Sequence, residues 1–144
     1  MWIKLTSSKI NRDEALNSVR HPRCGAVVTF EGTVRGVDEG RPVLALEYEV
    51  YEPLFRHELR KIFAEIRKRW GIDRFALIQR IGKLEVGEAG LFIAIASPHR
   101  SEALEALSYA IESFKQRAPV WKKEWTEPEG ARWVHCEHLT TTDR

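Results

Sequence analysis

The chain has 144 residues, the length of one ordinary domain, and is long enough to bury a core without disulfide or metal support. Its composition, 43% hydrophobic and 31% charged, is typical of a folded soluble protein and excludes a disordered chain. With 23 basic and 21 acidic residues the net charge is only +2, which argues against a general nucleic-acid binder. Any anion site must therefore come from a local cluster of cations.

The sequence lacks the segments that would direct a protein to a membrane or out of the cell. The N-terminal part of the sequence has no continuous apolar stretch of the kind found in a signal peptide, and no later run is long enough to span a membrane. We therefore expect a cytoplasmic protein without a membrane partner. The two cysteines are far apart and lack the spacing of metal ligands, so neither a zinc site nor a disulfide framework is indicated. We expect no bound metal and no cofactor.

The N-terminal half predicts a helix, two strands and a second helix. The first helix is expected from Asn11 on the surface of the protein, with Glu14 in the capping-box position. Residues 25–35 and 43–51 are rich in β-branched and aromatic side chains, and the glycine-containing turn between them predicts that they pair as a hairpin. Apolar residues then recur at helical spacing over residues 53–70, and the basic opposite face is expected in solvent.

The C-terminal half predicts three more strands and a long helix. Residues 74–81 and 91–96 are strand-like and are joined by the loop GKLEVGEAG. A helix is expected from about residue 99 to 117, because Pro119 prevents its continuation, and residues 132–137 predict a last strand. Strands that arrive in pairs between helices indicate an α+β domain with a mostly antiparallel sheet.

The start of this long helix carries positive charge where a helix prefers anions. If Ser97 caps the helix and Pro98 takes its first position, His99 and Arg100 lie in the first turn beside unpaired backbone N–H groups. Cations there oppose the helix dipole, so one interpretation is a missing anion such as phosphate. The other is that they pair with nearby acids such as Glu102.

Arg35 raises a similar question, because it closes a predicted strand just before a glycine-containing loop. Side chains at such places often face ligands, although an arginine at a strand end is more often simply solvated. The basic candidates have no attendant pair of carboxylates, and the chain lacks the motifs of nucleotide-binding loops, serine hydrolases and zinc peptidases. This combination favours electrostatic capture of a phosphate or carboxylate over metal-assisted hydrolysis.

The segment FKQRAPVWKKEW, residues 114–125, gathers four cations and two tryptophans around one proline. Lys115 lies in the last turn of the long helix, where the dipole favours a cation. If the chain beyond Pro119 is extended, Lys122 lies on one face and Lys123 on the other. A lysine crowded by cations or desolvated by tryptophan can act as a nucleophile, base or proton donor. The alternative is that the tryptophans pack on the core and the lysines extend into water.

Taken together, these segments resemble the family of molybdopterin synthase large, catalytic subunits. The combination of S-x-H-R with K-x-R-A-P-x-W-K-K-E is highly specific for that family. The matching stretches are GAVVTFEGTVR (25–35), LEYEVYEPL (46–54), RWGIDRFALIQRIGKLEVGE (69–88), IASPHRSEALEA (95–106), FKQRAPVWKKE (114–124) and RWV (132–134).

The resemblance implies an α/β-hammerhead-type fold for a large-subunit domain over residues 1–138. From the sequence itself we expect a flexible tail at residues 139–144. The resemblance also implies a sulfurtransferase that converts cyclic pyranopterin monophosphate, precursor Z, into molybdopterin during molybdenum cofactor biosynthesis. The sulfur would come from the thiocarboxylated C-terminus of a separate small, ubiquitin-like subunit. The large subunits would form a homodimer within a heterotetramer.

The same resemblance assigns roles to individual residues. Lys115 and Lys122 would be catalytic: Lys115 would meet the terminal carbonyl of the small subunit, and Lys122 would hold the pterin and assist proton transfer. The cyclic phosphate would lie at His99 and Arg100, with Arg35 reaching it from the other subunit of the dimer.

Arg117 and Lys123 are candidates for supporting charge only. Two other readings of the chain are a non-enzymatic module that stacks single-stranded RNA on its basic, aromatic segment, and a scaffold with the same fold but no catalysis. The balanced charge and the lack of an RNA-recognition motif disfavour the first reading, so no nucleic-acid partner is expected. The presence of both lysines disfavours the second.

Overall fold

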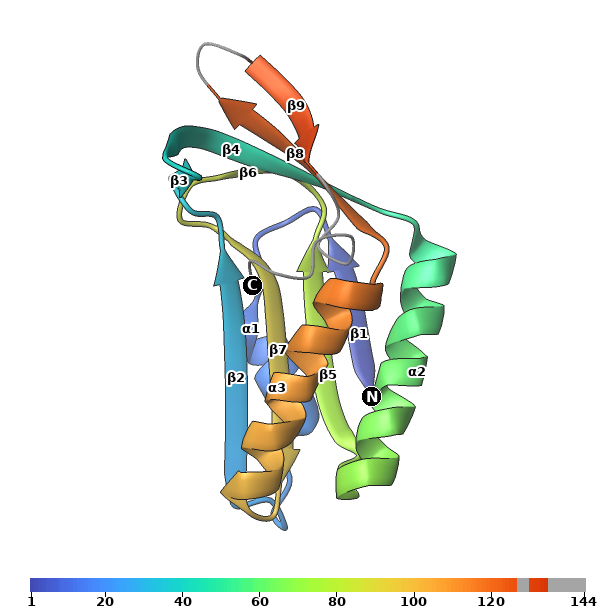
Figure 1. The fold of residues 1–144 in the computed structure, drawn as a ribbon. Coiled ribbons are helices and arrows are strands. Elements are labelled where there is room, and N and C mark those ends of the chain that lie inside the picture. The colour runs from blue at the N-terminus through green and yellow to red at the C-terminus, as the bar shows by residue number, and fades with distance from the viewer. Residues whose placement is uncertain (127–129, 135–144) are drawn as a thin grey trace.

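The structure, a computed structural model, describes residues 1–126 and 130–134. These residues form three helices and nine strands, which confirms the predicted α+β class (Figure 1). The tail expected at residues 139–144, and residues 135–137 of the last predicted strand, lie outside the described residues.

A four-stranded sheet forms one half of the fold. Its strand order is β1 (Trp2–Thr6), β5 (Arg74–Arg80), β7 (Ala89–Ser97) and β2 (Ala26–Thr33). β1 runs parallel to β5, and the other neighbours are antiparallel. The helices α2 (Glu52–Trp70) and α3 (Arg100–Arg117) cover one face of this sheet, and α1 (Arg12–Val19) covers the other.

The core follows from the alternation of side chains along the central strands. In β5 and β7 the odd-numbered residues, such as Phe75 and Ile93, pack against α2 and α3. The even-numbered residues, such as Ile78 and Ala94, pack against α1. Because helices cover both faces of the sheet, the buried residues of these strands are mostly apolar on both faces.

The second sheet has five strands and lies across one end of the first half of the fold (Figure 1). Its strands are β3 (Val37–Asp38), β4 (Arg41–Val50), β6 (Gly82–Glu85), β8 (Val120–Thr126) and β9 (Gly130–Val134). β4 is central: it pairs with β8 on one side and with β3 and β6 on the other, always antiparallel. β9 extends the sheet beyond β8.

The pairing of strands corrects part of the sequence prediction. Residues 25–35 and 43–51 do not form a hairpin: they become β2 and β4, which belong to different sheets. β2 pairs with β7, and β4 pairs with β6 and β8. By contrast, the strands predicted at 74–81 and 91–96 do pair, as β5 and β7. β-branched composition identifies a strand but says little about its partner, which depends on contacts distant in sequence.

The helix boundaries agree with the prediction except at one start. Asn11 caps α1 and its side chain accepts a hydrogen bond from the Asp13 N–H at 3.0 Å. α3, however, begins at Arg100 with His99 as the capping residue, so Ser97 is not the cap. Ser97 is instead the buried last residue of β7, opposite Ala26, and the strand has to end before the helix begins.

Candidate active site

The two predicted catalytic lysines lie on either side of the turn that connects α3 to β8. Lys115 is half-buried in the last turn of α3, and Lys122 is half-buried as the third residue of β8. α3 stops because Pro119 has no N–H and restricts the residue before it, and the Ala118 N–H bonds to the Phe114 carbonyl at 2.9 Å. The chain then enters the five-stranded sheet directly.

The extended conformation of β8 gives the alternation that the sequence predicted. Lys122 lies directly opposite Tyr48 of β4 and shares its face with Glu124. A Cβ added to Gly90 would be 2.9 Å from the Tyr48 ring, so this ring lies against the first residues of β7. The face that carries Lys122 therefore points toward the four-stranded sheet, and we call it the inner face of the five-stranded sheet.

A buried acidic residue on this inner face escaped the sequence analysis. Glu124 is only 3% exposed, and its Oε1 lies 3.4 Å from a guanidinium nitrogen of Arg41 and 3.5 Å from one of Arg132. Burial raises the pKa of Glu124 to about 7, and the nearby carboxylate of Asp38 acts in the same direction, while Arg41 and Lys122 oppose the shift. The alternation of β8 placed Glu124 beside Lys122, but nothing in the sequence indicated that it is buried.

Arg35 is exposed in the short loop between β2 and β3. The loop is attached to the turn before β7, because the Val34 N–H bonds to the Glu88 carbonyl at 3.0 Å and the Gly87 N–H to the Val34 carbonyl at 2.9 Å. α3 runs back along β7 and ends at this same end of the four-stranded sheet (Figure 1). One chain thus brings Arg35, Lys115 and Lys122 to one end of the fold.

His99 and Arg100 lie at the opposite end. Ser97 at the end of β7 pairs with the first residue of β2, whereas Ala89 at its start pairs with the last. His99 and Arg100 follow Ser97, are exposed, and begin a helix of 18 residues, which is about 27 Å long. Within one chain the predicted phosphate-binding pair is therefore separated from Lys115 by nearly the whole of α3.

The two candidates for supporting charge both have partners. Arg117 faces α2, where it binds the carboxylates of Glu65 and Glu58. Lys123 is on the outer face of the five-stranded sheet, with its Nζ 4.7 Å from the centre of the Trp133 ring. Both cations are thus oriented by neighbours outside the inner face.

Comparison with known proteins identifies the family. A family model described as MoaE protein matches residues 5–117, which is more than half of the chain. The chain belongs to the MoaE family. A molybdopterin synthase catalytic subunit from Bos taurus is 44% identical over 131 residues, which are 91% of this chain and 69% of that protein. One from Bacillus subtilis (strain 168) is 43% identical over 138 residues, 96% of this chain and 87% of the relative.

Solved structures agree with this assignment. Molybdopterin synthase from Staphylococcus aureus matches with a TM-score of 0.86 and 35% sequence identity, over 91% of this chain and 95% of the other. The fold of this MoaE chain is therefore that of an enzyme with an experimental structure. The predicted family of molybdopterin synthase catalytic subunits is confirmed.

Two further features of the MoaE chain concern what it could hold. In residues 1–126 and 130–134, no three histidine, cysteine, aspartate or glutamate side chains are grouped closely enough to hold a metal ion. In the same residues, no helix combines the length and the apolar character needed to cross a membrane.

Proposed function

We propose that the chain catalyses the conversion of precursor Z to molybdopterin, with sulfur from the thiocarboxylated C-terminus of a separate small, ubiquitin-like subunit. The observation that carries this proposal is the pair of Lys115 and Lys122 at the turn between α3 and β8, in a chain of the MoaE family. The relatives are named catalytic subunits, which fits a separate partner chain. No metal, cofactor or nucleic acid takes part in the proposed reaction.

Lys115 would bind the terminal carbonyl of the small subunit. It lies in the final turn of α3, where a cation is favoured by the carbonyl ends of the helix. An ammonium group held there can stabilise the negative charge of a thiocarboxylate and of the oxyanion formed when its carbonyl carbon is attacked. Partial burial strengthens both interactions, because less water competes for the charge.

Lys122 would bind the pterin and assist proton transfer as sulfur adds and an oxygen leaves as water or as phosphate oxygen. Its place on the inner face, beside Tyr48 and near Glu124, supports this role. A leaving oxygen needs a proton, and a lysine ammonium can donate one. Lys122 opposes the rise in the pKa of Glu124, so the two groups interact, and the ionised carboxylate attracts the cation.

The phosphate would be bound by a second copy of the chain. His99 and Arg100 lie at the end of α3 opposite Lys115, so one chain cannot complete the predicted site. In a homodimer, the start of α3 in one protomer would lie beside Arg35, Lys115 and Lys122 of its partner. Arg100 and the N–H groups of the first turn would then bind the cyclic phosphate. With two small subunits this gives a heterotetramer, which we propose to be cytoplasmic.

The experiment combines the purified protein, precursor Z and the thiocarboxylated small subunit, and measures dithiolene product. The parent protein should form product, and Lys122→Ala should lower the rate by at least about 100-fold, the scale for one preorganised electrostatic group. Lys83→Ala is the matched control, because Lys83 lies on the outer face with its Nζ 4.1 Å from the Trp125 ring centre. Absence of product from the parent protein would refute the function, and unchanged turnover in Lys122→Ala would refute its role.

A further inference from the structure

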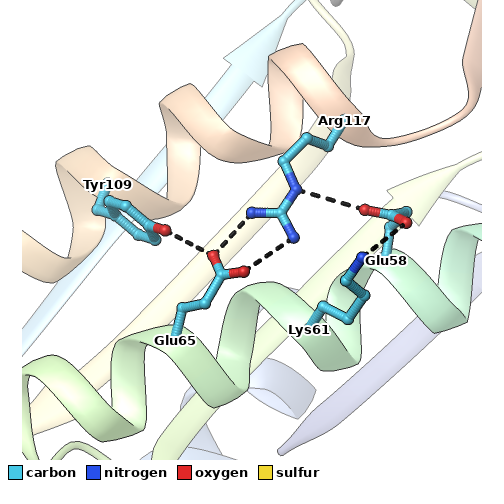
Figure 2. A network of polar contacts seen from close by, with 5 residues as sticks. All are labelled: Glu58, Lys61, Glu65, Tyr109 and Arg117. Atoms are coloured by element: carbon cyan, nitrogen blue, oxygen red, sulfur yellow. Dashed lines mark hydrogen bonds and ion pairs between the residues drawn. The ribbon is translucent and has the colours of Figure 1, made fainter.

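A network of polar contacts ties the end of α3 to α2 (Figure 2). Two nitrogens of the Arg117 guanidinium donate to the two oxygens of Glu65, at 2.7 and 3.1 Å. The Tyr109 hydroxyl donates to the same Glu65 carboxylate at 2.5 Å. Arg117 Nε also donates to Glu58 at 3.3 Å, and Glu58 lies 3.8 Å from the ammonium of Lys61. Arg117 is thus held by two carboxylates from one neighbouring helix.

The charges of this network support one another. The hydrogen bonds from Arg117 lower the pKa of Glu65, with a further contribution from Tyr109, and Glu65 raises the pKa of Arg117. A two-pronged contact between a guanidinium and a carboxylate fixes direction as well as distance. The contact therefore restricts the rotation of the last turn of α3 about the helix axis.

Lys115 lies on the same turn as Arg117 but faces another direction. Residues two apart are about 200° apart around a helix, and the buried Phe114 lies between the two flanks. Because Arg117 is turned toward α2, Lys115 is on the flank turned away from α2. Any rotation of the last turn would therefore move the Lys115 ammonium, and Ala118 and Pro119 leave a short connection to Lys122.

We propose that Arg117 is a positioning residue for Lys115, acting through its contacts with Glu65 and Tyr109. The inference rests on the proposed function, since it gives Lys115 the catalytic role described above. It differs from a role for Arg117 as a cation that binds substrate directly. In the positioning role, the network matters even when the positive charge of Arg117 is kept.

Glu65→Gln separates these two roles, because it removes the carboxylate and leaves Arg117 charged. We expect the rate at saturating precursor Z to fall by about 10-fold or more, as for a small misplacement of a catalytic group, with little change in the half-saturating concentration. Tyr109→Phe should give a smaller loss of rate in the same direction. Glu65→Gln combined with Arg117→Gln should lose no more rate than the worse single variant, since the two residues act as one unit.

Glu105→Ala is the matched control. It removes another hydrogen bond between α2 and α3, from Trp70 Nε1 to Glu105 at 2.9 Å, but near the start of α3 and far from Lys115. This variant loses a contact between the same two helices, while its rate should stay at the parent level. An equal loss of rate in both variants, or a higher half-saturating concentration as the only effect of Glu65→Gln, would overturn the proposal. If the parent protein forms product and Glu65→Gln forms it at the same rate, only the positioning role of Arg117 is refuted. If the parent protein forms no product, the proposed function is refuted.

Discussion

Glu124 and Arg41 face each other across the neighbouring strands β8 and β4, with 3.4 Å between a carboxylate oxygen and a guanidinium nitrogen. The Glu124 carboxylate is nevertheless almost fully buried, and the carboxylate of Asp38 lies near it. An acid in this setting is easier to protonate than one in water, because burial and a nearby negative charge both disfavour its charged form.

This arrangement predicts an unusual dependence of stability on pH. The pKa of Glu124 is raised from 4.5 to about 7, so the native protein holds a proton there that the unfolded chain releases. The contribution of Glu124 to stability is therefore fully present below the lower value and is lost as pH rises through the upper one. Urea unfolding of the parent protein and Glu124→Gln at about pH 5 and pH 8 should show the parent losing stability relative to the variant. A difference between them that stays constant with pH would contradict this prediction.

For Glu65 we predict a dependence of stability on pH of the opposite sign. Its pKa is lowered from 4.5 by the hydrogen bonds from Arg117, so its stabilising contribution is present above the ordinary value and is lost as pH falls through the lowered one. Glu65→Gln should therefore be less stable than the parent protein near neutral pH, and the gap should close in acid. Thermal unfolding from neutral pH down to about pH 3 measures this gap. A gap that widens in acid would show that the ion pair is not its cause.

The residues of the predicted site lie at two ends of the fold, and this separation predicts that two inactive variants restore activity when they are mixed. Lys122→Ala and Arg100→Ala should each be inactive alone. A dimer that contains one copy of each has one intact site, made of Arg100 from the first protomer and Lys122 from the second. After subunit exchange, an equal mixture should recover about one quarter of the parent activity, as expected for random pairing in a two-fold dimer. No recovery, with exchange verified by mass spectrometry, would place the whole site within one chain.

The lack of space beside Gly90 shows how closely the two sheets pack near Lys122, and it can be tested by adding a methyl group. A Cβ at this position would be 2.9 Å from the Tyr48 ring, closer than van der Waals contact, so Gly90→Ala must displace the ring that lies opposite Lys122. We expect a loss of about 1–3 kcal/mol in unfolding free energy, typical of overpacking. Gly32→Ala is the control, because its added atom would meet its nearest neighbour at an ordinary 3.5 Å. In a Tyr48→Ala background the loss from Gly90→Ala should disappear, and its persistence there would point to a different cause.

The helices could be predicted from the sequence because their signals are local. The capping side chain of Asn11, the early Pro53 and the terminating Pro119 act within a few residues, and α1, α2 and α3 begin or end within one or two residues of the predicted positions. The two faces of β8 were also predictable, since an extended chain alternates whatever its partner. Each of these features depends on neighbours along the chain.

The features that were not predicted correctly depend on contacts between residues distant in sequence. β1 was not predicted, because its five residues carry too weak a signal without the parallel partner β5. The sequence also grouped His99 and Arg100 with the lysines by charge, whereas the distance between them follows from the direction of α3. The contacts of Glu124 with Arg41 and Arg132 could not be predicted either, because the two arginines approach it from two other strands.

The five-stranded sheet is joined to the rest of the fold through very short connections. Within residues 1–126 the chain passes between the two parts five times, and the linking segments are 34–36, 51, 81, 86–88 and 118–119. Lys115 and Lys122 belong to different parts, so these five short connections keep the distance between the two lysines fixed. Lengthening one connection should make that distance more variable. The exposed turn at Glu39 and Gly40 lies within one sheet, so it should accept an inserted peptide without altering the distance.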